Sequence, residues 1–173
     1  MVEAHFNRTF VLGVLLLMVG CTNERGAPPP VADDQAVEAC DAALAFEAET
    51  SHPGGTVRGV LRLSIARGWH TYADPPGDSG MPPLLSLETA SGQELETGPF
   101  DFPPPETFKD VVGVTYGYEG TVELPFSVTL PERAAGPLAV KGTVEWLICR
   151  DICLPVTSTV DARLDIAPSP RAD

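Results

Sequence analysis

The chain has 173 residues, which is enough for one ordinary domain with a substantial hydrophobic core once an export signal is set aside. It carries 24 acidic and 11 basic residues, and the resulting net charge of −13 argues against a nucleic-acid-binding surface and against electrostatic docking on anionic lipid. Any contact with a membrane must therefore come from another feature of the chain.

The N-terminal segment, residues 1–20, has the pattern of a bacterial export signal. Its apolar run at 9–20 follows Arg8 and is too short to span a bilayer easily. The run ends in MVGC at 18–21, which resembles the lipobox of bacterial lipoproteins, with methionine where leucine is usual. This resemblance implies cleavage before Cys21 and a lipid on its sulfur, whereas the alternatives are an ordinary secretory signal or an uncleaved anchor. The residue after Cys21 is threonine and not the aspartate that often retains lipoproteins in the inner membrane, which slightly favours the outer membrane of the envelope.

A polar, proline-rich segment follows at residues 21–36, and it contains too little apolar surface to fold. We expect this segment to act as a flexible tether. The folded domain is expected to cover residues 37–167, and residues 168–173 would form a short C-terminal tail.

Within the expected domain, apolar residues recur at every second position, which is typical of half-buried β-strands. The clearest runs lie at 56–65 and 122–130, and weaker ones lie at 44–48 and 85–87. Turn-forming sequences such as HPGG, PPGDSG and PERAAG separate the runs, and 18 prolines with 16 glycines leave little room for long helices. The sequence therefore predicts an all-β fold, an antiparallel β-sandwich.

Two further strands are predicted at 140–149 and 153–166, and in both of them a cysteine falls on the polar face. In one continuous strand the Cα atoms of Cys149 and Cys153 would lie about 13 Å apart, whereas a disulfide needs less than about 7 Å. The chain must therefore turn between them if they are bonded. A three-residue loop at 150–152 would make the two cysteines cross-strand neighbours on one exposed face.

The chemistry of this cysteine pair admits three interpretations. A disulfide that closes so short a loop would stabilise the domain by only about 2 kcal/mol, so stability is a weak reason for it. Exposed disulfides in tight rings tend to be easily reduced, which favours thiol–disulfide exchange over a passive structural bond. Copper or zinc binding is disfavoured, because the histidines of the mature chain, His52 and His70, lack metal-like spacing to the pair.

Four ordered sequence blocks resemble the N-terminal, periplasmic domain of the DsbD-type thiol:disulfide interchange proteins, also called protein-disulfide reductases. The blocks are GWHTYADPPGDSGMPP at 68–83, FPPPETF at 102–108, VTYGYEGTVELPFSV at 114–128 and WLICRDICLPV at 146–156. The resemblance implies an immunoglobulin-like sandwich that carries electrons from a membrane-embedded thiol transporter to thioredoxin-fold proteins of the periplasm. Such a domain is an enzyme only in the sense of an electron carrier, and it uses no cofactor or metal.

The resemblance also implies roles for individual residues. Cys149 and Cys153 would form a redox-active disulfide, with Cys153 joining partner proteins and Cys149 resolving the mixed disulfide. Phe108 would be the aromatic residue of a cap that shields the pair, and its alternative role is ordinary core packing. Four further aromatic residues would either line the pair or fill the sandwich, namely Trp69, Tyr72, Tyr116 and Tyr118.

Two features depart from the family pattern. Full-length relatives continue into a multi-helix membrane domain and a thioredoxin-like domain, so the sequence predicts a stand-alone, lipid-tethered module. Cys40 lies outside the four blocks and has no assigned role. The sequence leaves open which proteins donate and accept the electrons, and whether cytochrome c maturation, disulfide isomerisation or oxidative repair is served. The rival function is a non-catalytic, partner-binding sandwich in which the cysteine pair is a fixed brace.

Overall fold

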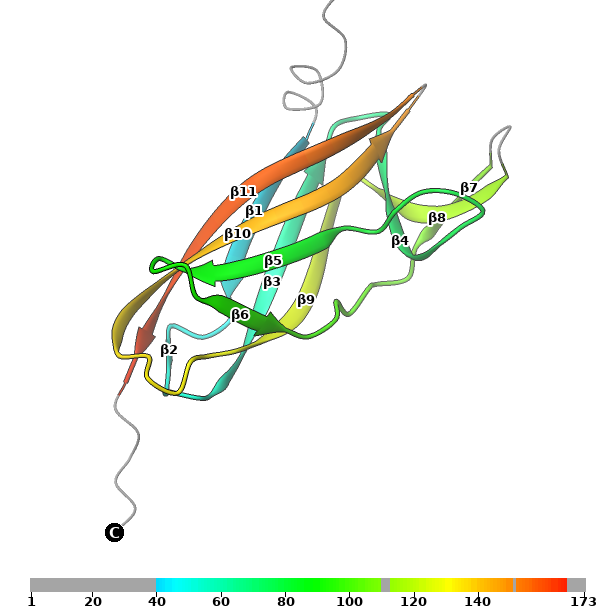
Figure 1. The fold of residues 1–173 in the computed structure, drawn as a ribbon. Coiled ribbons are helices and arrows are strands. Elements are labelled where there is room, and N and C mark those ends of the chain that lie inside the picture. The colour runs from blue at the N-terminus through cyan, green and yellow to red at the C-terminus, as the bar shows by residue number, and fades with distance from the viewer. Residues whose placement is uncertain (1–39, 110–112, 151, 168–173) are drawn as a thin grey trace, which may run out of the picture.

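The computed structural model describes residues 40–109, 113–150 and 152–167, in which eleven β-strands and no helix occur (Figure 1). The expected signal, tether and C-terminal tail lie outside these ranges. No segment within them forms a helix capable of crossing a membrane. In chain order the strands are β1 (Cys40–Phe46), β2 (Thr50–Ser51), β3 (Thr56–Ile65), β4 (His70–Gly77), β5 (Leu84–Thr89), β6 (Glu94–Thr97), β7 (Glu106–Lys109), β8 (Val114–Glu119), β9 (Thr121–Thr129), β10 (Gly136–Cys149) and β11 (Cys153–Ile166).

The strands form two layers that face each other across a hydrophobic core. One layer has the order β1-β3-β9-β6, and the other contains β11, β10, β5, β4, β8 and β7. The pairing of β5 with β6 joins the layers at one edge. The strand pairs are antiparallel except for the short β2, which lies parallel to β11. This arrangement confirms the predicted all-β, immunoglobulin-like antiparallel sandwich.

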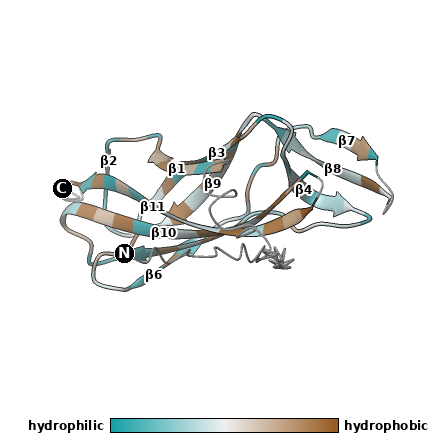
Figure 2. Cartoon of the chain, turned by 90° about the horizontal axis from the view of Figure 1, so that it is seen from above, coloured by the Kyte–Doolittle hydropathy of each residue, from teal (hydrophilic) through white to brown (hydrophobic). Residues whose placement is uncertain are grey.

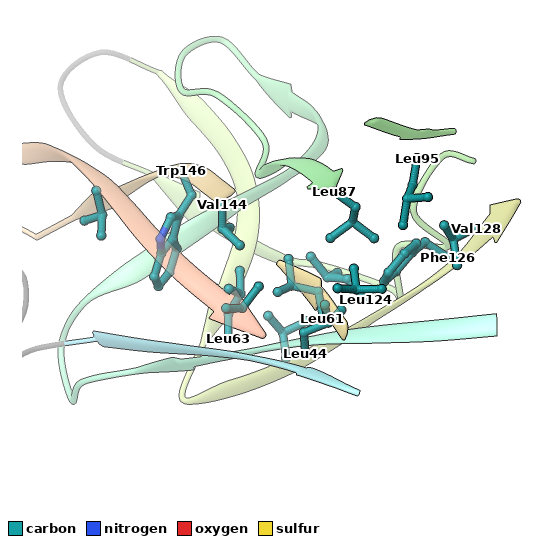
Figure 3. Close-up of a cluster of buried hydrophobic side chains, with 14 of the residues drawn as sticks. Leu44, Leu61, Leu63, Leu87, Leu95, Leu124, Phe126, Val128, Val144 and Trp146 are labelled. Carbon is teal, nitrogen blue, oxygen red and sulfur yellow. The ribbon is translucent and has the colours of Figure 1, made fainter. Parts of the chain in front are cut away.

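The alternation of apolar residues places the core where the sequence predicted it. Val144 and Trp146 of β10 are fully buried, and their side chains point toward the opposite layer, where Leu63 lies across from Trp146 (Figure 3). Removing a side chain of this size from water stabilises the fold by about 1.5–3 kcal/mol. The second layer is therefore held firmly along β10, the strand that leads to the cysteines.

The length of β10 positions the candidate site at one end of the sandwich. Its 14 residues all pair with β11, from Gly136 opposite Ile166 to Cys149 opposite Cys153. On its other edge β10 pairs first with β5 and then, at Cys149, with His70 of β4. Strands β4, β8 and β7 thus extend the second layer beyond β5, and we call these three strands the wing. Seen from above, the wing lies at the end of the molecule away from β2 (Figure 2).

One local prediction was wrong, because the PPGDSG sequence is not wholly a turn. Strand β4 continues through Pro75 and Pro76 to Gly77 before the chain turns. The register between β4 and β8 is interrupted between Tyr72 and Gly77, so the two prolines lie where the ladder is irregular. Proline lacks an N–H donor and is tolerated in a strand at such interruptions.

Candidate functional site

The two cysteines at the end of the β10–β11 hairpin form a disulfide. Cys149 and Cys153 are paired across the strands with their Cα atoms 4.1 Å apart. The backbone N–H of Arg150 donates a hydrogen bond to the carbonyl oxygen of Ile152 at 3.1 Å, which closes the loop. The predicted hairpin and the predicted cross-strand pairing of the cysteines are therefore confirmed.

The two cysteines differ in their exposure to solvent. Cys153 is exposed, as predicted, but Cys149 is only 3% exposed. The prediction that both cysteines lie on an open face was wrong for Cys149. Strand alternation assigned this residue to the correct face, but it could not show that β4 pairs beside Cys149 and places the Tyr72 side chain against its sulfur. The disulfide therefore has one accessible side and one covered side.

Three rings of the wing form a chain of contacts that ends at the covered sulfur. The hydroxyl of Tyr72 donates a hydrogen bond to Cys149 Sγ at 2.9 Å and lies 3.5 Å from Cys153 Sγ. The Tyr72 ring meets His70 edge to face, with centroids 5.4 Å apart, and His70 stacks on Phe108 at 4.4 Å with 14° between the planes. We call Phe108, His70 and Tyr72 the aromatic stack. The expected cap residue, Phe108, thus contacts His70, and its link to the sulfurs runs through His70 and Tyr72.

Strand geometry explains why these three rings lie on one face of the wing. His70 and Tyr72 are two positions apart on β4, so they point to the same face. On β8, Gly117 pairs with Tyr72 and Thr115 pairs with Phe108 of β7, which places Phe108 on that same face. Alternation and register therefore put the three rings on one face of the wing, although Phe108 is aligned with Gly77 and not with His70.

Two glycines allow Tyr72 to pack so closely. Gly80 lies against the face of the Tyr72 ring and has a φ of 101°, a conformation that side-chain-bearing residues rarely adopt. Gly117 lies against the backbone of Thr71, where a Cβ atom would overlap the carbonyl group. A larger residue at either position would displace Tyr72 from the disulfide.

Tyr116 and Tyr118, which the sequence suggested as neighbours of the pair, lie on the other face of the wing because they alternate with Thr115 and Gly117. The hydroxyl of buried Tyr118 donates a hydrogen bond to the carbonyl oxygen of Pro103 at 2.7 Å, and burial raises the pKa of this hydroxyl. Tyr116 is partly exposed and lines a shallow groove with prolines 103–105. Both tyrosine side chains therefore lie on the face of the wing opposite the disulfide.

Trp69, another suggested neighbour of the pair, lies in the core and holds the tip of the hairpin. Its ring is buried, and the guanidinium group of Arg150 lies 4.6 Å from the ring centroid. A cation–π contact at a partly exposed site contributes about 0.5–1 kcal/mol. This contact holds the Arg150 side chain against the core beside the cysteine pair.

The role of His70 was missed from the sequence, where it was weighed only as a metal ligand. The available signal was the spacing His-x-Tyr, which puts both rings on one face of a strand. Within the described ranges, no group of three or more histidine, cysteine, aspartate or glutamate side chains could hold a metal ion.

Cys40 is a free cysteine buried at the start of β1. It belongs to the hydrophobic core, where it packs as a small apolar side chain. Burial raises the pKa of its thiol, and a hydrogen bond with the backbone of Ala66 partly offsets that effect. The thiolate form is therefore disfavoured in the folded protein.

Comparison with known proteins places these features in a family context. The family model described as "Thiol:disulfide interchange protein DsbD, N-terminal" matches residues 34–165. The N-terminal periplasmic domain of ScsB from Proteus mirabilis is similar in structure, with a TM-score of 0.51 and 21% identity over 75% of this chain and 47% of that one. A cohesin module from a family 33 glycoside hydrolase of Clostridium perfringens has a TM-score of 0.50 and 8% identity over 76% of this chain and 98% of that one.

At these identities the two structures establish a shared fold alone. The chain spans about half the length of the ScsB chain that it matches, 47%. No curated protein sequence matches the chain.

Proposed function

The chain belongs to the family of the N-terminal domain of the thiol:disulfide interchange protein DsbD, and from this membership we propose that it is a thiol–disulfide exchange module of the cell envelope. In this proposal the Cys149–Cys153 disulfide accepts reducing equivalents from a membrane-embedded thiol transporter. The reduced pair then passes them to thioredoxin-fold proteins outside the cytoplasm. The protein acts as a protein-disulfide reductase component, an electron carrier in which the sulfur atoms do the chemistry.

The observation that supports this proposal best is the unequal exposure of the two cysteines. An incoming thiolate can reach the exposed Cys153, and attack there makes the covered Cys149 the leaving group. Negative charge then develops on Cys149 Sγ, the atom to which the Tyr72 hydroxyl already donates a hydrogen bond at 2.9 Å. A donor placed where charge develops lowers the barrier of the step. A disulfide that only stabilised the fold would not require one exposed sulfur and one covered, hydrogen-bonded sulfur.

Reduction of the pair follows two exchange steps. A thiolate of the electron donor attacks Cys153 Sγ, so a donor–Cys153 disulfide forms, the Cys149–Cys153 bond breaks, and its electron pair leaves on Cys149 Sγ. The second thiolate of the donor then attacks the donor sulfur of this mixed disulfide, and Cys153 departs as a thiolate. The donor leaves as a disulfide, and the pair has gained two electrons, with two protons taken up to complete its thiols.

Electron delivery runs the same chemistry toward the acceptor. The Cys153 thiolate attacks one sulfur of the acceptor disulfide and expels the other sulfur as a thiolate. Cys149 then attacks Cys153 Sγ, which restores the Cys149–Cys153 disulfide and releases the acceptor as a dithiol. Cys153 is therefore the residue that joins partners, and Cys149 is the resolving residue.

We assign the shielding expected of Phe108 to the whole aromatic stack. The outer ring, Phe108, lies against His70, and the inner ring, Tyr72, covers the disulfide. A stack of this kind keeps small oxidants and thiols away from Cys149 while leaving Cys153 open to a docked protein.

We also propose that the module is held at a membrane by a lipid on Cys21, with residues 1–20 as its signal and residues 21–36 as its tether. The outer membrane is slightly favoured on the residue that follows Cys21. Globomycin, which blocks cleavage of lipoprotein signals, should cause the full-length precursor to accumulate in the host. Cleavage that is insensitive to globomycin would point to an ordinary secretory signal.

Trapping of partner proteins tests the exchange function directly. The Cys149→Ser variant should accumulate mixed disulfides through Cys153 when it is expressed in the host, because the resolving sulfur is missing. The matched Cys153→Ser variant should trap far fewer partners, because its remaining cysteine is covered. Equal trapping by the two variants, or none by either, would favour the fixed brace.

A further inference from the structure

We propose that Ile152 is an anchor for the partner protein and that it fills an apolar recess beside the partner's reactive cysteine. This inference rests on the proposed exchange function and adds the chemistry of the surface that the hairpin tip recognises. Ile152 is 51% exposed, and only two other large hydrophobic side chains in the described part of the chain are exposed to a similar degree, Leu84 and Tyr116. Ile152 directly precedes Cys153, the accessible cysteine of the pair.

A mixed disulfide at Cys153 brings the partner close to Ile152. Two disulfide-bonded cysteines have their Cα atoms about 4.4–6.8 Å apart, and neighbouring Cα atoms in a chain are about 3.8 Å apart. The Cα atom of a partner cysteine bonded to Cys153 must therefore lie within about 11 Å of the Ile152 Cα atom, so the exposed Ile152 side chain is in reach of the partner's surface. An aliphatic side chain in that position is stabilised by apolar surroundings and destabilised by polar groups that lose water.

Two residues of the loop, Arg150 and Ile152, are held in place before a partner arrives. The backbone N–H of Arg150 donates to the carbonyl oxygen of Ile152 at 3.1 Å, and the Arg150 guanidinium lies over the ring of Trp69. Behind the tip, β10 and β11 are paired without interruption. A residue whose backbone is already held, as that of Ile152 is, loses less conformational entropy on binding, which is the property of an effective anchor.

The charge of the chain favours an apolar anchor at this place. The protein carries a net charge of −13, so long-range attraction would select partners by charge alone and with little specificity. An exposed aliphatic side chain next to the exchanging sulfur acts only at contact. It therefore selects partners whose reactive cysteine has a nonpolar neighbourhood, and it disfavours thiols that lie among charged groups.

The test compares a protein thiol with a small thiol on the same disulfide. Reduced thioredoxin serves as the protein probe and dithiothreitol as the small one, and the ratio of the two second-order rate constants reports recognition of the surface. Since about half of the Ile152 side chain is left to be buried, Ile152→Ala should lower this ratio about fivefold. Ile152→Val should lower it less.

Leu84→Ala is the matched control, because Leu84 is also 51% exposed and aliphatic but lies on β5, opposite Glu145. This variant should keep the native ratio. Circular dichroism spectra and melting temperatures establish that each variant is folded. If the native protein exchanges with thioredoxin but Ile152→Ala keeps the native ratio of rate constants, the anchor is refuted while the exchange function stands. The same conclusion follows if Leu84→Ala lowers the ratio as much as Ile152→Ala does. A native protein that thioredoxin does not reduce would instead overturn the proposed function.

Discussion

Replacing Tyr72 with phenylalanine should make the disulfide harder to reduce. The substitution keeps the ring of the aromatic stack and removes the hydroxyl that donates to Cys149 Sγ at 2.9 Å. In the reduced protein this hydroxyl would face a thiolate, and hydrogen bonds to charged groups contribute about 1.5–3 kcal/mol, against about 0.5–1.5 kcal/mol for neutral ones. The hydroxyl therefore stabilises the reduced state over the oxidised state by about 1–1.5 kcal/mol.

This free-energy difference converts into a measurable reduction potential. For a two-electron couple about 1.4 kcal/mol corresponds to about 30 mV, so Tyr72→Phe should lower the potential by about 20–30 mV. The shift should be larger at about pH 9 than at about pH 6, because only the thiolate gains the charged hydrogen bond. A role for Tyr72 in packing alone would not produce this pH dependence.

The assay equilibrates the protein with defined ratios of oxidised and reduced dithiothreitol and counts free thiols by alkylation and gel shift. Tyr116→Phe is the matched control, because it removes the same group from the opposite face of the wing. Its potential should equal that of the native protein. A Tyr72→Phe potential that is unchanged at both pH values, or raised, would refute the proposed contribution of the hydroxyl.

Three further predictions concern the cap, the disulfide and the free cysteine. Phe108→Ala should speed alkylation of the reduced pair by iodoacetamide several-fold, because the outer ring of the aromatic stack is lost. The control is Thr107→Ala, on the opposite face of β7, which should leave the alkylation rate unchanged. Replacing Cys149 and Cys153 together by serine should lower the free energy of unfolding in urea by no more than about 2 kcal/mol, and a loss above about 4 kcal/mol would indicate a brace. Burial raises the pKa of the Cys40 thiol, so stability should hold below the ordinary thiol pKa of about 8.5 and fall as the pH rises above it. Cys40→Ala should reduce that fall in urea unfolding measured from about pH 7 to about pH 9.5, and an identical slope would contradict the assignment.

The long strands could be predicted from the sequence because one periodicity decides both local structure and burial. Along β10, the residues predicted to face inward, from Val140 to Ile148, are all buried. The same alternation on β11 set the register and therefore the hairpin that joins Cys149 to Cys153. Here, local and tertiary preferences agree, and the prediction needed no knowledge of other parts of the chain.

The wing could not be predicted in the same way. Alternation tells which face a residue is on, but whether that face is covered depends on strands that are distant in sequence. The side chain of Tyr72 on β4 lies against Cys149, and β4 itself contains two prolines that predict a turn. The aromatic stack requires the register of β4, β8 and β7 together. His70 was consequently missed, although its spacing to Tyr72 was visible.

The path of the chain through the sandwich gives the domain a direction. Cys40, the first described residue, pairs with Ile65, and the chain then reaches His70, which pairs with Cys149. The chain thus enters at the end that carries the disulfide. It leaves at the other end of the long hairpin, after Ile166 (Figure 1).

For a molecule anchored through Cys21, the 19 peptide units to Cys40 could extend at most about 68 Å. Such a molecule would carry its reactive sulfurs on the side nearest the bilayer that holds its anchor. The other end of the sandwich, where β11 ends, would face away from that bilayer. A donor embedded in the bilayer that holds the lipid anchor could meet the sulfurs without any reorientation. A donor in the opposite bilayer could meet them only after the whole domain had reoriented on its tether.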